Sequence, residues 1–158
     1  MWIWFLLVGI VAIVIVAGVK NGKKITQLKN EGKIINRKSN YAANGEEFTS
    51  KIGSFQALRD QLEKLLPECW REGNTSTVVN FKSSSFSARL YKVDFDAASG
   101  IGIFRFEFTH WRTGRYGYEE DTLMNMLMTA VEKTFLTLDP NTSVKSYELN
   151  IKTKHSLF

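Results

Sequence analysis

The chain opens with an unbroken apolar run. Residues 2–19, WIWFLLVGIVAIVIVAGV, contain no charged or strongly polar side chain. As a helix, this run would rise about 27 Å at ~1.5 Å per residue, close to the ~30 Å hydrocarbon thickness of a bilayer. The pattern predicts a single transmembrane helix, with Trp2 and Trp4 at the membrane–water interface.

A cleavable signal peptide is the first alternative to an anchor. Signal peptides have a positively charged start, a shorter apolar run and small residues before the cleavage site. Here only Met1 precedes the run, and the best cleavage position, after Gly18, has Val16 three residues before the cut. A buried core helix is the remaining alternative. We therefore predict a permanent membrane anchor.

Further along the chain, apolar periodicity predicts a small folded domain. Apolar residues three or four positions apart predict helices over 55–66 and 119–137. Alternating or β-branched stretches predict four strands, over 76–82, 85–95, 100–111 and 144–153. The order α-β-β-β-α-β predicts two helices on one face of an antiparallel four-stranded sheet, a two-layer α+β fold.

The strand over 100–111 shows the clearest alternation. Phe106 lies at the centre of its apolar face, so it is expected to face the helices. Glu107 points the other way, and its replacement by alanine is expected to cost little.

Three parts of the chain follow from these patterns. Residues 1–19 are the expected transmembrane helix, and residues 20–47 are a basic juxtamembrane segment and linker. The end of this linker, SNYAANGEE at 39–47, lacks apolar periodicity. Residues 48–158 are the expected cytoplasmic α+β domain, which is long enough for one core.

Basic residues gather directly after the apolar run. Residues 20–38 carry seven bases against one acid, Glu31, and the bases nearest to the run are Lys20, Lys23 and Lys24. Positive charge beside a membrane span is held on the cytoplasmic side. This predicts a cell-membrane protein with its N-terminus outside and its C-terminal domain in the cytoplasm. The same bases are expected to attract the anionic headgroups of the lipid bilayer.

The net charge of +5 does not indicate nucleic-acid binding. Residues 39–158 carry fourteen bases and fifteen acids, so the excess charge lies entirely in the juxtamembrane segment. A nucleic-acid-binding domain needs its basic stripe in the folded part. The single cysteine, Cys69, cannot form an intramolecular disulfide, which is typical of a reducing compartment.

Catalytic and metal-binding patterns are sparse. The two histidines, His110 and His155, belong to no known catalytic or zinc-binding motif. Asp94 and Asp96 share a strand face and could hold a divalent cation, but no third ligand is near them in sequence. We therefore expect no metal site, no cofactor and no enzymatic activity.

One loop gathers residue types that are typical of binding surfaces. The stretch HWRTGRYGYEED at 110–121 contains Trp111, Arg112, Arg115 and Tyr116. Such residues anchor many protein interfaces. The alternative is structural: the aromatic residues would cap the core, and the arginines would pair with neighbouring acids.

These features favour a single-pass membrane-anchored protein whose small cytoplasmic domain binds a protein partner. The alternative is a membrane-tethered sensor that binds a small ligand between the sheet and the helices. A deep apolar pocket would favour the sensor. An exposed apolar patch would favour the partner.

Overall fold

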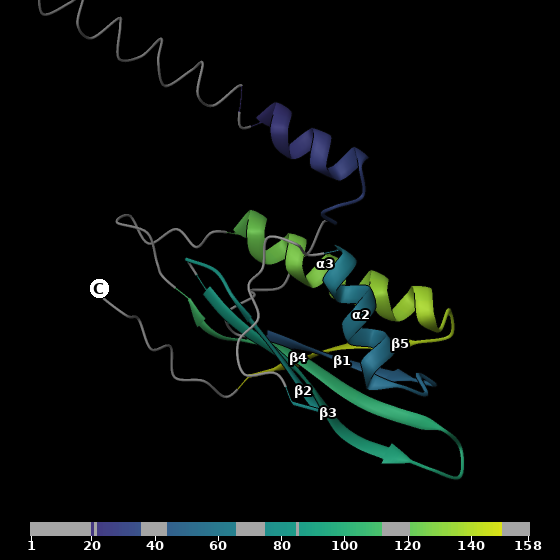
Figure 1. Ribbon diagram of the computed structural model, residues 1–158. Coiled ribbons are helices and arrows are strands. Elements are labelled where there is room, and N and C mark those ends of the chain that lie inside the picture. The colour runs from purple at the N-terminus through teal and green to yellow at the C-terminus, as the bar shows by residue number, and fades with distance from the viewer. Residues whose placement is uncertain are drawn as a thin grey trace, which may run out of the picture. The chain divides into compact units, whose positions relative to one another are not determined.

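The computed structural model describes residues 20, 22–35, 44–65, 75–84, 86–111 and 121–149 (Figure 1). The chain divides into two units, Met1–Ile35 and Asn36–Phe158. In the first unit, residues 22–30 are helical. The second unit contains the sheet and two further helices.

The second unit is built on a five-stranded antiparallel sheet in the order β2-β3-β4-β1-β5. Its strands are β1 (Asn44–Ser50), β2 (Val78–Lys82), β3 (Phe86–Asp96), β4 (Ile101–Trp111) and β5 (Ser143–Glu148). The helices α2 (Phe55–Leu65) and α3 (Asp121–Leu138) lie on the same side of this sheet (Figure 1). The result is a two-layer arrangement with β4 at the centre of the sheet.

Phenylalanine rings fill the layer between the sheet and the helices. Phe106 of β4 is completely buried there, which confirms the predicted facing of this strand. Phe48 of β1 stacks on Phe135 of α3, with ring centroids 4.2 Å apart. Phe55 of α2 lies parallel to Phe104 of β4 at 6.1 Å. Both helices are therefore held to the sheet through aromatic contacts.

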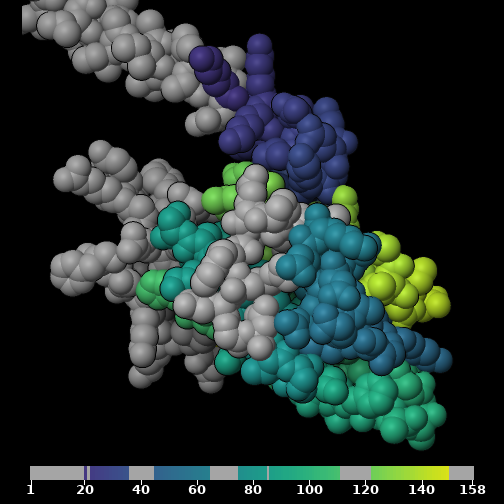
Figure 2. Space-filling model, viewed as in Figure 1, coloured from purple at the N-terminus to yellow at the C-terminus, as the bar shows by residue number. Residues whose placement is uncertain are grey.

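The hairpin that joins β3 to β4 forms at the predicted turn. The carboxylate of Asp96 accepts hydrogen bonds from the backbone N–H of Ala98 at 2.9 Å and from the hydroxyl of Ser99 at 2.6 Å. Gly100 closes the turn with a φ of 69°, a conformation that glycine adopts without steric cost. The tip of this hairpin projects beyond the rest of the sheet (Figures 1 and 2).

The predicted fold, a transmembrane helix followed by a two-layer α-β-β-β-α-β domain, is wrong. The sheet has a fifth strand, β1, so the domain order is β-α-β-β-β-α-β. This strand begins at Asn44, inside the stretch that was expected to be a linker. Its Asn-Gly-Glu-Glu start has low strand propensity. Pairing with β4 on one side and β5 on the other overrides that propensity.

No helix in the described part of the chain is both long and apolar enough to cross a membrane. The predicted transmembrane segment, residues 1–19, lies outside the described residues. The neighbouring bases Lys20, Lys23 and Lys24 are described, and all three are exposed to solvent.

Replacing Phe106 by alanine tests the register of β4. The side chain is fully buried, so Phe106→Ala should lower the free energy of unfolding by roughly 3–5 kcal/mol through lost transfer energy and the cavity left behind. Val93→Ala is the control, because Val93 is 44% exposed on β3 and should change stability by under ~0.5 kcal/mol. Urea denaturation measures both. Equal losses would mean that the register is wrong.

Candidate functional site on the open face of the sheet

Within the second unit, the described helices α2 and α3 both lie on one face of the sheet, and we call the opposite face the open face. Cross-strand pairing brings polar and aromatic side chains together on this face. We call them the open-face cluster: Glu47, Arg89, Tyr91, Arg105, Glu107, Lys145 and Tyr147. They come from four adjacent strands, β3, β4, β1 and β5.

Two arginine–glutamate pairs form the centre of the cluster. Arg89 on β3 donates from Nε to Oε1 of Glu107 on β4 at 2.6 Å. Arg105 on β4 donates from Nε to Oε2 of Glu47 on β1 at 2.9 Å. The hydrogen bond to Glu47 raises the pKa of the Arg105 guanidinium above its usual value, so this group stays charged.

The two ion pairs have their positive ends outward. In the first pair, the Arg89 side chain is 48% exposed while that of Glu107 is only 8% exposed. In the second, the corresponding fractions are 39% for Arg105 and 25% for Glu47. A molecule that approaches this face therefore meets guanidinium groups before it meets carboxylates.

Tyr147 connects the edge strand β5 to the centre of the sheet. Its hydroxyl donates to Oε2 of Glu107 at 3.1 Å. Its ring lies against Gly45 of β1, where an added Cβ would be only 2.5 Å from the Cζ atom of the tyrosine. Any side chain at Gly45 would therefore displace this ring. The guanidinium carbon of Arg105 lies 5.0 Å from the centre of the same ring, within range of a cation–π contact.

The second tyrosine supports the other arginine. The guanidinium carbon of Arg89 lies 4.9 Å from the ring centroid of Tyr91. Burial raises the pKa of Tyr147 well above its usual value, and the negative charge of Glu107 and the neighbouring Tyr91 raise it further. Tyr147 therefore stays protonated and remains a hydrogen-bond donor.

This arrangement is suited to binding. Both carboxylate oxygens of Glu107 already accept hydrogen bonds, one from Arg89 and one from Tyr147. The contacts hold two arginine side chains in fixed positions, which lowers the conformational entropy lost when a partner binds.

Of the four loop residues that the sequence singled out, the structure describes only Trp111. Trp111 is the last residue of β4. Arg112, Arg115 and Tyr116 lie outside the described residues. Both interpretations of the 110–121 loop therefore stay predictions.

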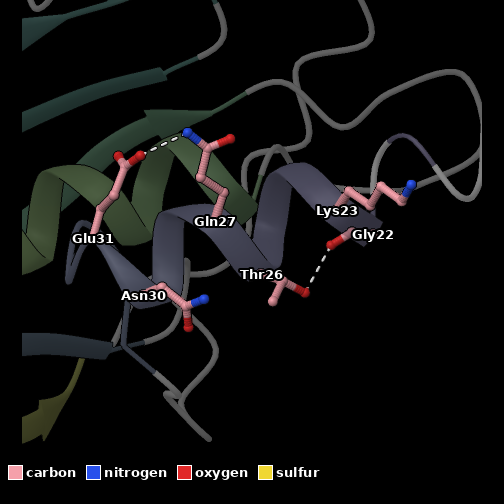
Figure 3. A pocket seen from close by; sticks show the side chains of 6 residues that line it. All are labelled: Gly22, Lys23, Thr26, Gln27, Asn30 and Glu31. Atoms are coloured by element: carbon pink, nitrogen blue, oxygen red, sulfur yellow. Dashed lines mark hydrogen bonds between the residues drawn. The ribbon is translucent and has the colours of Figure 1, made fainter.

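Lys23 and Lys24 lie in the helix at residues 22–30, which has a shallow hollow on one side (Figure 3). This hollow is lined by Gly22, Lys23, Thr26, Gln27, Asn30 and Glu31. Its polar side chains bond within the helix, as Gln27 Nε2 does to Glu31 Oε1 at 2.7 Å. The described lining residues lie on one side of this helix and the turn that follows it, so the hollow is an open surface groove.

The Asp94 and Asp96 pair serves the backbone of the β3–β4 hairpin. Asp94 accepts a hydrogen bond from the N–H of Phe95 at 2.8 Å, and Asp96 holds the turn. Across the described residues, no three potential metal ligands lie close enough to hold an ion.

Comparison with known protein families, curated proteins and solved structures finds no match to this chain. The sequence alone placed Arg105 and Glu107 on the polar face of their strand without indicating a site. A usable signal was present: Arg89 and Tyr91, like Arg105 and Glu107, stand two residues apart in strands joined by a short turn. Such spacing places each pair on one face.

The expectation that Glu107→Ala costs little does not hold, because Glu107 is buried although it faces away from the helices. Its loss leaves Tyr147 and Arg89 without their acceptor. We expect the free energy of unfolding to fall by about 1–3 kcal/mol. The matched control is Glu148→Ala on the exposed end of β5, which should cost under ~0.5 kcal/mol. Denaturant titrations in which the two variants behave alike would contradict the network.

Proposed function

We propose that this chain is a membrane-anchored, non-enzymatic interaction protein whose cytoplasmic domain binds a protein partner through the open-face cluster. The observation that carries this proposal is the pair of outward-facing arginines, each supported by a tyrosine ring. Arginine and tyrosine are among the residues that contribute most to binding energy at protein interfaces. Here they occupy the sheet face opposite to the one that α2 and α3 cover.

Attachment to the cell membrane is supported by the sequence. Residues 2–19 are apolar throughout, and seven bases follow within residues 20–38. Bases on one side of an apolar segment favour retention of that side in the cytoplasm. Lys20, Lys23 and Lys24 are solvent-exposed, as contact with anionic lipid headgroups requires.

Packing between the sheet and the helices favours partner binding over a small-ligand sensor. Phe104 and Phe48 both contact Phe135, with ring centroids 5.2 Å and 4.2 Å apart. Phe81 meets the edge of Phe106 at 6.0 Å. These rings occupy the layer where a buried ligand would lie.

Reporter fusions after Phe158 test the orientation. A reporter that functions only in the cytoplasm should be active there, and one that functions only outside the cell should be silent, because the bases follow the apolar run. The reverse pattern would refute the cytoplasmic assignment. Secretion of the reporter into the medium would indicate a cleaved signal peptide instead.

Affinity capture of the full-length protein from its own membranes tests the binding face. Arg105→Ala should reduce the captured partner at least about tenfold, because truncation of an arginine that anchors an interface costs about 2 kcal/mol or more. The control is Lys64→Ala, which removes an exposed positive charge from α2 in the helical layer. Thermal melting of each variant checks its fold. Retention of every wild-type partner by a folded Arg105→Ala variant would exclude this face.

A further inference from the structure

We infer that the open-face cluster recognises carboxylate groups of an acidic segment in a protein partner, with Arg105 as the principal hydrogen-bond donor to a carboxylate. This inference rests on the proposed function and specifies the chemistry of the partner. Three features of the cluster support it: the terminal nitrogens of Arg105, which bond to no other described residue; the lower exposure of the two acids; and the position of Lys145 beside Glu47.

Arg105 presents an unused hydrogen-bonding edge. Its Nε is committed to Glu47, and among the described residues its two terminal nitrogens form no hydrogen bond. The Glu47 contact and the ring of Tyr147 hold the guanidinium from two sides. A planar guanidinium held in this way offers two parallel N–H groups, which match the two oxygens of a carboxylate.

Within the cluster, the positive charges are the more exposed ones. Glu47 and Glu107 are less exposed than the arginines that they pair with. Lys145 of β5 stands opposite Glu47 on the side away from Arg105 and is exposed, so Glu47 is flanked by two cations. The exposed acids on this face, Asp94 and Asp96, lie further along β3 toward the hairpin turn. Three bases against two less exposed acids therefore favour an anionic partner at the cluster itself, and complementary charge increases both specificity and the rate of association.

The geometry of the cluster favours carboxylates as its anions. Two carboxylates of the protein, those of Glu47 and Glu107, already bond to the arginines on this face of the sheet. An acidic peptide segment would place further carboxylates over the exposed sides of the same arginines. The tyrosine rings beside the cations would contact the methylene groups of glutamate side chains. Lipid phosphate is the competing anion, and vesicle binding distinguishes it.

The test uses the full-length protein in uncharged detergent micelles and a fluorescent short poly-L-glutamate peptide as the probe. Arg105→Lys keeps the charge but removes the planar two-point contact, so the dissociation constant should rise by about tenfold or more. Lys145→Gln should weaken binding severalfold. Lys64→Gln, the same charge change on the helical layer, should leave the affinity unchanged.

Several outcomes would overturn the inference. Equal affinity in wild type, Arg105→Lys and Lys145→Gln would exclude the cluster as the site. Loss of binding only when Lys20, Lys23 and Lys24 are all replaced by glutamine would assign the probe to the juxtamembrane segment. If the cluster variants lose binding to phosphatidylserine vesicles but keep poly-L-glutamate binding, the anion is a lipid headgroup.

Two further comparisons keep the inference separate from the proposed function. If Arg105→Lys unfolds in a thermal melt, Lys145→Gln decides, because that side chain is exposed. If the protein binds the probe normally but captures no protein, the proposed interaction function is contradicted, whereas carboxylate binding by the cluster is not. Captured partners that depend on Arg105, in a protein that does not bind the probe, would contradict the acidic partner and leave the function standing.

Discussion

The domain depends on the pairing of β1 between β4 and β5. Without this strand, β5 would have no neighbour in the sheet, and the sheet would end at β4. The same strand supplies Phe48 to the core, where it stacks on Phe135 of α3. On the opposite face it supplies Glu47 and the space at Gly45 that the Tyr147 ring occupies. One strand of weak intrinsic propensity therefore supports both faces, because its backbone is hydrogen-bonded on both edges.

The two faces of the sheet are stabilised by different interactions. On the helix side, burial of phenylalanine rings removes apolar surface from water, an effect roughly proportional to area and not directional. On the open side, ion pairs and hydrogen bonds must satisfy a carboxylate that is almost fully buried. A buried charge is tolerated only when it is paired and hydrogen-bonded. Glu107 meets that requirement through Arg89 and Tyr147. These directional bonds fix the positions of the side chains on the open face.

The same fixed geometry gives the open face its proposed role. Side chains that are already held in position lose little entropy when a partner binds. The buried acids hold the arginines in place while the arginines remain accessible. Tethering at a membrane would confine the domain to a thin layer and raise its effective concentration for partners there. In this proposal the N-terminal segment determines where the domain acts, and the open-face cluster determines what it binds.

Much of the secondary structure could be read from the sequence. Alternation predicted the strand containing Phe106, and helical periodicity predicted α2 and α3, because those patterns reflect burial on one side of a regular element. The turn at Asp96–Gly100 could be predicted because its aspartate, serine and glycine are residue types that form turns locally. The apolar character of residues 2–19 is likewise a property of the sequence alone.

Tertiary structure decided the rest. β1 was missed because its Asn-Gly-Glu-Glu start resembles a linker, and only contacts with strands more than fifty residues away make it a strand. The open-face cluster combines residues from 47 to 147, and its register depends on that pairing. The bonded partners of Glu107 come from two other strands, Arg89 from β3 and Tyr147 from β5. Local patterns report which face a residue occupies, whereas the contacts on that face arise from distant segments that only the folded chain brings together.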